Sequence, residues 1–250
     1  GTNAVAIGKG ATANGQNSFS IGQNAVSGTT GGNNYAVAIG EGATGTGSFS
    51  TSIGGFTDAT AQHSLALGSF AQAIGVSSVS LGRSYASGAD SFAAAIANST
   101  SSYGATGSNS VAIGQQAKAT SVWSTAIGFA CQSSHVSAVA IGNQNTASQS
   151  YSVALGRQSV ADKVGKFAFA SYSLASVGQS QTGMMVLVSS TTDATPKALT
   201  TDNSGASTTN QVILPNNSAY FFSGTIIARE QASAGTDVGA WEIKGAIRRE

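Results

Sequence analysis

Large apolar and small residues alternate in a short pattern that recurs from the first residues to about Ala175. The pattern is Val-Ala-Ile-Gly or a close variant of it. Successive copies stand fourteen positions apart in eight of eleven cases. An internal repeat of this kind predicts a solenoid in which each copy forms one rung. The last position of the pattern falls at Gly8, Gly22, Gly40, Gly54, Gly68, Gly82, Ala97, Gly114, Gly128, Gly142, Gly156 and Ala170.

Alternation with a period of two predicts a short strand with one buried face in every rung. The length of the repeat leaves room for a second short strand and two tight turns, and glycine suits a turn with positive φ. We expect the large residues to point inward, where stacked rungs share one core. The predicted core residues are Val5, Ile7, Ile21, Ile39, Ile53, Leu67, Leu81, Ile96, Val111, Ile113, Ile127, Ile141 and Leu155.

A roll with such short rungs is narrow. It encloses only a couple of large side chains per rung, so it is too thin to be stable alone. The sequence therefore predicts self-association along the rod axis. On the same grounds Ile113→Asp should disrupt the rod, because an unpaired buried carboxylate is costly.

The repeat resembles a known motif. Residues Asn109–Gly114 read Asn-Ser-Val-Ala-Ile-Gly, and variants recur at Ser78–Gly82 and Ser152–Gly156. This is similar to the YadA-like head of trimeric autotransporter adhesins, and the similarity covers about residues 1–175. It implies a left-handed parallel β-roll, three chains packed side by side as a homotrimer, and a role in surface attachment. The same head repeats also occur in tail-fibre proteins of bacteriophages.

The composition changes after the last rung. Residues 1–156 contain six charged side chains and the remaining 94 contain fifteen. We predict two domains, a β-roll at 1–175 and a small antiparallel β-domain at 176–250, making the chain all-β. Within the second, runs at Met184–Val188, Gln211–Leu214, Tyr220–Ala228 and Trp241–Arg248 predict strands, five or so in total.

The stretches Leu214–Arg229 and Trp241–Arg248 together resemble a segment common in phage and prophage tail-fibre proteins. The first residues already form a repeat, and in such fibres more β-structure follows the segment at the end. We therefore expect this chain to be a fragment of a longer protein.

Charge and hydropathy exclude several classes of protein. Charged residues make up 8% of the chain and the net charge is +1, so no basic surface for nucleic acid is predicted. The sequence has no run of about 18 apolar residues, so no helical membrane insertion is expected. A single cysteine, Cys131, leaves no intrachain disulfide framework.

Candidate chemical groups are few and scattered. His63 and His135 fall at different phases of the repeat, so they predict no metal pair, and Cys131 replaces alanine in a small-residue column. Glycoside cleavage needs two carboxylates across a groove, and no two carboxylates are set apart as such a pair. We expect no catalytic, metal or cofactor site. The carboxylates weighed for the C-terminal domain are Asp193, Asp202, Glu230, Asp237 and Glu242.

Two longer spacings indicate loops inserted into rungs, at 28–34 and 98–109. Inserted loops are where solenoids usually display binding groups, although a tolerated irregularity is the simpler interpretation. Exposed aromatic residues could stack on sugars, or fill gaps between chains of a trimer. The candidate surface-binding residues are Asn33, Asn34, Tyr103 and Trp123.

Four functions compete. The favoured one is a phage tail fibre in the virion, whose partners are further copies of itself, other tail or fibre proteins, and a host glycan or protein receptor. The alternative is an adhesin head on a bacterial cell surface. An ice-binding solenoid needs ranks of Thr-x-Thr, which are missing. A hexapeptide acyltransferase has longer coils, each built from three hexapeptide units, and the shorter period of this chain argues against it.

Overall fold

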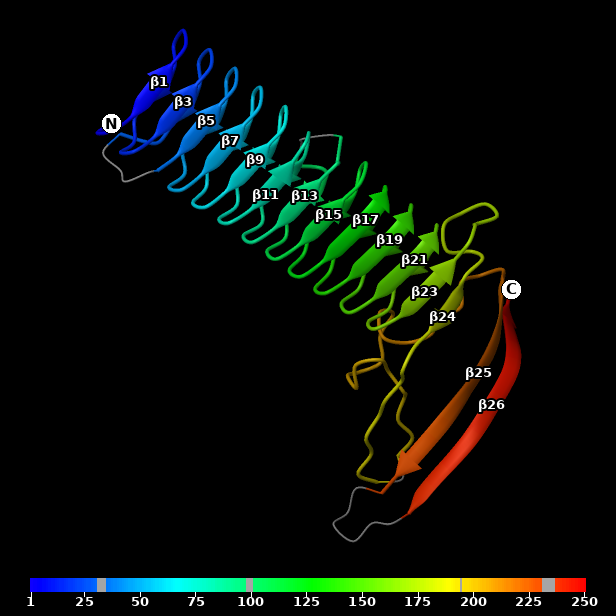
Figure 1. The fold of residues 1–250 in the computed structure, drawn as a ribbon. Coiled ribbons are helices and arrows are strands. Elements are labelled where there is room, and N and C mark those ends of the chain that lie inside the picture. The colour runs from blue at the N-terminus through cyan, green and yellow to red at the C-terminus, as the bar shows by residue number, and fades with distance from the viewer. Residues whose placement is uncertain (31–34, 98–100, 194, 231–236) are drawn as a thin grey trace. The chain divides into compact units, whose positions relative to one another are not determined.

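The computed structural model describes residues 1–250 except 31–34, 98–100, 194 and 231–236. Its main element is a roll of stacked rungs, each adding one strand to each of two parallel sheets (Figure 1). All regular elements among the described residues are β-strands. The prediction of an all-β parallel solenoid is confirmed, as are the two short strands per rung.

The first sheet holds the strands of the alternating pattern. Adjacent strands pair in register, so that Val5 lies opposite Phe19 and Ile7 opposite Ile21. Among the described residues twelve strands run parallel, and β24 (Thr182–Met184) closes the sheet antiparallel to β23. The parallel strands are β1 (Val5–Ile7), β3 (Phe19–Ile21), β5 (Val37–Ile39), β7 (Thr51–Ile53), β9 (Leu65–Leu67), β11 (Val79–Leu81), β13 (Phe92–Ala94), β15 (Val111–Ile113), β17 (Thr125–Phe129), β19 (Val139–Asn143), β21 (Val153–Arg157) and β23 (Phe167–Ala170).

The second sheet lies across the interior from the first. In the part of the chain that the structure describes, it holds eleven strands of two residues each. These strands are β2 (Thr12–Ala13), β4 (Val26–Ser27), β6 (Thr44–Gly45), β8 (Asp58–Ala59), β10 (Gln72–Ala73), β12 (Tyr85–Ala86), β14 (Gly104–Ala105), β16 (Lys118–Ala119), β18 (Gln132–Ser133), β20 (Thr146–Ala147) and β22 (Val160–Ala161).

The seventh rung departs from the predicted alignment. Val79 pairs with Phe92 and Ile113 pairs with Ala94, so Ala95 and not Ala97 occupies the glycine position. Ile96 therefore lies outside the column to which the sequence assigned it. Its side chain is fully buried all the same, and it packs in the main alanine cluster. The alignment from the sequence and the alignment in the structure differ by two positions. The pairing of β13 with β11 and β15 decides between them.

The prediction of the inward face is wrong for the single chain. The middle, small residue of each strand is buried, as in Ala38, Ser52 and Ala112, while the large residues on either side are half-buried or exposed. Of the predicted core residues, all of which the structure describes, Ile96 alone is fully buried. The reason is geometric, because such short strands enclose a narrow interior that is filled mainly by small side chains such as Ala, Ser, Thr and Cys.

Hydroxyl groups in this interior bond to each other and to the backbone. Ser20 and Ser27 face each other across one rung, with their Oγ atoms 2.7 Å apart. In another rung Ser52 Oγ donates to Thr57 Oγ1 at 2.7 Å. At these positions serine therefore substitutes for alanine without leaving a buried donor unpaired.

The glycine that ends each pattern is required by the backbone. Gly54 has a φ of +133°, and a Cβ there would lie 2.8 Å from the carbonyl carbon and oxygen of Gly68 in the next rung. Its neighbour Gly55 has no such φ, and a Cβ there would meet only Ser69 Oγ at 3.9 Å. The two adjacent glycines thus serve different purposes.

We expect Gly54→Ala to lower the free energy of unfolding by about 2–3 kcal/mol, from backbone strain and the clash with the next rung. The matched control, Gly55→Ala, is expected to be neutral or to stabilise by up to about 1 kcal/mol. Thermal unfolding followed by circular dichroism measures both changes. Equal melting temperatures for the two variants would contradict the assigned role of Gly54.

The regular rungs end after β23. The chain forms two compact units, residues 1–210 and 211–250, so residues 176–210 belong to the same unit as the roll. The second unit is one antiparallel hairpin of β25 (Ser218–Arg229) and β26 (Val238–Arg249), paired over twelve positions. The described residues thus hold two long strands there, not five or so. Gln211–Leu214, predicted as a short strand, forms no strand. The strand predicted at Met184–Val188 is not formed either, and β24 ends at Met184.

Candidate functional site

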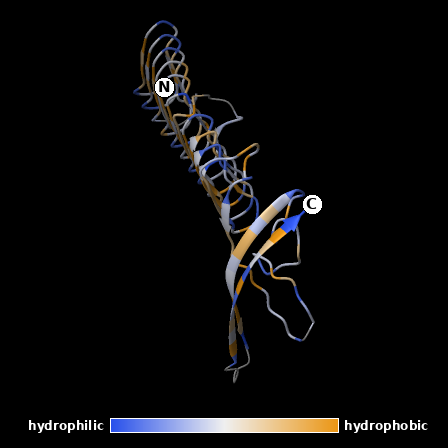
Figure 2. Ribbon diagram, turned by 90° about the vertical axis from the view of Figure 1, so that its right-hand side faces the viewer, coloured by the Kyte–Doolittle hydropathy of each residue, from blue (hydrophilic) through white to orange (hydrophobic). Residues whose placement is uncertain are grey.

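Two columns of large apolar side chains run along the outside of the first sheet. They come from the first and third residues of each strand, on either side of the buried small residue. The side chains of Ile7 (55%), Leu67 (45%) and Phe169 (50%) are among the most exposed. Hydrophobic colour recurs at the same place in successive rungs (Figure 2). We call these two columns the apolar stripe.

The stripe holds one or two large apolar residues in every rung. Neighbouring strands of a sheet lie about 4.8 Å apart, so the members of each column contact one another along the rod. A contiguous apolar surface of this length is unusual on a monomeric protein and marks an interaction site. Its members are Val5, Ile7, Phe19, Ile21, Val37, Ile39, Ile53, Leu65, Leu67, Val79, Leu81, Phe92, Val111, Ile113, Ile127, Val139, Ile141, Val153, Leu155, Phe167 and Phe169.

The outside of the second sheet has a different chemistry. The outward residue of each of its strands is mostly polar, and examples are Thr44, Lys118 and Gln132. Gln72 Nε2 donates to Asp58 Oδ2 of the previous rung at 3.3 Å. One face of the roll is therefore suited to water and the other to burial.

Exposed aromatic residues stack along the turns. Tyr35 and Phe49 lie 5.2 Å apart between ring centroids with nearly parallel planes, and His63 continues the row at 5.3 Å. Phe56 and Phe70 form a second row at 5.5 Å. These residues were missed by the sequence reasoning, although they recur with the period of the repeat, a signal that would have revealed them.

The structure divides the predicted surface-binding residues. Trp123 is 61% exposed at a turn. Tyr103 is half-buried and packs against the alanine core, so only part of its ring is at the surface. Its place directly before β14 holds the ring against the buried alanines of the roll. Asn33 and Asn34 lie outside the described residues.

The histidines and the cysteine have unrelated settings. His63 belongs to an aromatic row, whereas His135 Nδ1 lies 3.2 Å from Ser134 Oγ. Cys131 is fully buried in the column otherwise filled by residues such as Ala117. Desolvation by burial raises the pKa of its thiol, which disfavours the reactive thiolate. Among the described residues, no three His, Cys, Asp or Glu side chains gather as metal ligands.

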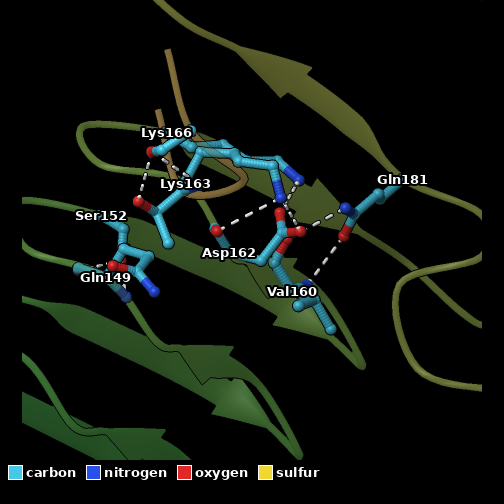
Figure 3. A network of polar contacts seen from close by, with 9 residues as sticks. Gln149, Ser152, Val160, Asp162, Lys163, Lys166 and Gln181 are labelled. Carbon is cyan, nitrogen blue, oxygen red and sulfur yellow. Dashed lines mark hydrogen bonds and ion pairs between the residues drawn. The ribbon is translucent and has the colours of Figure 1, made fainter. Parts of the chain in front are cut away.

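A polar cluster covers the last rung of the roll (Figure 3). Lys163 Nζ contacts Asp162 Oδ2, and Lys166 Nζ lies 2.8 Å from Asp162 Oδ1. Gln181 Oε1 accepts a hydrogen bond from the Val160 backbone N–H at 2.8 Å, and Gln181 Nε2 donates one to the Val160 carbonyl oxygen at 3.0 Å. Val160 belongs to the last strand of the second sheet, so Gln181 supplies the hydrogen bonds that a further rung would make.

Charge in this cluster sets a pH dependence. Burial alone would raise the pKa of Asp162, but hydrogen bonds from Lys163 and Lys166 outweigh it and hold the pKa below its usual value. At pH values above the unfolded pKa near 3.9, the ionised carboxylate therefore stabilises the polar cluster that caps the last rung. This stabilisation is lost as the pH falls through the folded pKa. The Asp162 side chain is 43% exposed, so the contribution is small.

We expect Asp162→Asn to speed amide hydrogen exchange in β22 by a few-fold at pH 6. The difference from the unmodified protein should shrink as the pH falls through the folded pKa of Asp162, because the carboxylate then loses its charge. Exchange in β4, near the other end of the same sheet, is the internal control and should not change. An equal acceleration in β4 would show a global loss of stability and contradict the local cap.

Comparison with known proteins gives one family. The model of the YadA head domain repeat matches residues 1–25, 59–84, 105–130 and 136–159, all within the roll. No curated protein sequence matches the chain. Among the described residues, no helix is long and apolar enough to cross a membrane.

Proposed function

We propose, on the premise that four segments of the roll match the YadA head domain repeat, that the protein is a homotrimeric attachment fibre. The observation that carries this proposal is the apolar stripe on the outside of the first sheet. The roll interior holds mainly alanine and serine, so the large side chains gain full burial only against another molecule. Fully burying one such side chain is worth about 1.5–3 kcal/mol relative to leaving it exposed.

A closed assembly of three parallel rolls fits the shape of the stripe. The stripe is continuous, and its rungs are nearly identical along the roll. Three parallel rolls with their stripes toward one axis bury every stripe at once and form a closed ring. The polar outsides of the second sheets then face water, which agrees with residues such as Lys118 and Gln132.

The mass of the protein in solution tests this assembly. Light scattering on the purified full chain should give three times the chain mass of 24.6 kDa. The mass should stay constant on dilution across the micromolar range, because the stripe is long. A single-chain mass would overturn the proposal.

The finer assignment is a tail fibre of a phage virion that contributes to host attachment. It is supported by the C-terminal segment, whose stretches Leu214–Arg229 and Trp241–Arg248 resemble phage tail-fibre sequences. The alternative, an adhesin head on a bacterial surface, is supported by the family of the repeats. Antibodies raised against the purified trimer separate the two by electron microscopy. Labelling of virion tails supports the first, whereas labelling of intact bacterial cells supports the second.

Attachment implies a receptor on the target cell, either a glycan or a protein. Fluorescently labelled trimer should bind host cells, and pretreatment of the cells identifies the receptor class. Loss of binding after periodate oxidation indicates a glycan, and loss after protease treatment indicates a protein. Failure to bind any candidate host would contradict an attachment role.

We also propose that the chain binds without catalysing a reaction. The proposal is supported by the small number of nucleophilic and acid–base side chains. Cys131 is buried, and the two histidines lie in unrelated settings. Incubation of the trimer with host polysaccharide should release no reducing ends. Time-dependent release that survives further purification would identify an enzyme.

A further inference from the structure

Most rungs have two turns where the backbone takes positive φ at a residue other than glycine. The leading turn residue lies five positions before the glycine position, as in Phe49, with a φ of 60°. The trailing turn residue lies two positions after the glycine position, as in Phe56, with a φ of 54°. The two are half a repeat apart, so they form opposite edges of the roll (Figure 1).

Aromatic residues occur on both edges in the same rungs. In two neighbouring rungs a ring at the leading turn is matched by a ring at the trailing turn. The pairs are Phe49 with Phe56 and His63 with Phe70.

Three further leading-turn rings lack such a partner. Tyr35 has Gly42 on the opposite edge, Trp123 has Ala130, and Tyr151 has Gln158. Tyr35 stacks on Phe49 and so extends the first block of rings, and Arg83 closes that block 5.6 Å from the centroid of Phe70. Matched rings are therefore a property of particular rungs and not of the whole roll.

Polar rungs show the same correspondence. Asn17 has Asn24 on the opposite edge, and Ser137 has Gln144. All four take φ near +55°, so the backbone is the same whether a rung is aromatic or polar. The turn geometry therefore does not require aromatic residues.

Contacts within one chain do not explain the pairing. Each ring contact among the described residues joins neighbouring rungs along one edge, never the two edges of one rung. Phe49 is 51% and Phe56 is 49% exposed, and bulky residues are disfavoured in the left-handed region. The matched chemistry thus points to a contact outside the chain.

A closed ring of three parallel rolls provides this contact. Ring symmetry places the leading edge of every chain beside the trailing edge of its neighbour, with equal rungs at equal height. We propose that the paired aromatic residues form a seam between neighbouring chains, with Phe49 of one chain packed on Phe56 of the next. The occupant of each aromatic edge is a second copy of this chain, and the inference rests on the proposed trimer.

A double-mutant cycle tests the seam. Asparagine occurs naturally in both turn columns, so Phe49→Asn and Phe56→Asn keep the backbone conformation. Each variant alone should lower the trimer melting temperature by about 2–4 °C, and the double variant by little more than one of them. The control pair, Phe56→Asn with Trp123→Asn, joins different rungs and should be additive. Additive losses in the Phe49 and Phe56 pair would overturn the seam.

Chemical cross-linking gives an independent outcome. In a Cys131→Ala background, Phe49→Cys combined with Phe56→Cys should give covalent trimers with a short bis-maleimide, because every chain links to the next. Trp123→Cys combined with Phe56→Cys should give none. A light-scattering trimer that yields only single chains would overturn the seam and leave the proposed trimer intact. Loss of binding to host glycans in Phe49→Asn, with additive melting, would overturn the seam and assign the edge to a ligand instead.

Discussion

Ala112→Asp is expected to unfold the roll. Ala112 is fully buried in β15, and its register partners Ala93 and Ala126 are buried as well. The alanine-lined interior gives a carboxylate neither space nor a counter-charge, so the loss of stability should be about 3–5 kcal/mol. Circular dichroism should show a lower β-content or a much lower melting temperature.

The matched control is Gln115→Asp, which introduces the same charge into the same rung at an exposed position. We expect it to change the free energy of unfolding by less than about 0.5 kcal/mol. If Ala112→Asp melts like this control, the small residues do not form the interior.

Ile113→Asp, at the next position, is expected to break the assembly instead. Ile113 lies on the apolar stripe, so three carboxylates would meet at the trimer axis without water or counter-charge. Trimer stability should fall by several kcal/mol, and the mass by light scattering should shift toward the single chain. This replaces the interpretation from the sequence alone, in which the same substitution acts inside the roll.

Mixing chains separates the two interpretations. Ile113→Asp chains refolded together with Ile113→Lys chains should form mixed trimers, because opposite charges meet at the axis. Neither variant should assemble well alone. Ala112→Asp and Ala112→Lys chains should not rescue each other, since each is damaged within its own roll. Absence of rescue at position 113 would contradict the outward direction of Ile113.

Much of the architecture could be predicted because it is periodic. The spacing of the Val-Ala-Ile-Gly pattern defined the rungs, the parallel stacking and the turn glycines, since one residue type per column reveals a shared environment. The seventh rung shows the limit of this signal. Phe92–Ala94 and Ala94–Ile96 both follow a large–small–large pattern loosely, and the ladder pairing of Val79 with Phe92 decided between them.

The candidate surfaces were less predictable. Trp123 was recognised because its large ring interrupts a stretch of mostly small residues. The cluster of Asp162, Lys163 and Lys166 was not recognised, although its members lie within five positions of one another, because the repeat pattern does not show that their charged groups meet. Gln181 gives no signal at all in the sequence, since its role depends on lying across from Val160 at the end of a sheet.

The sequence by itself determined that large and small residues lie on opposite faces of each strand, because side chains alternate along a strand. It did not determine which face is inside. That was decided by the tertiary structure, because rungs this short close around an interior too narrow for a column of isoleucine or valine. The large side chains were thereby placed outside, and the feature that looked like the core of one chain became the surface through which we propose that three chains associate.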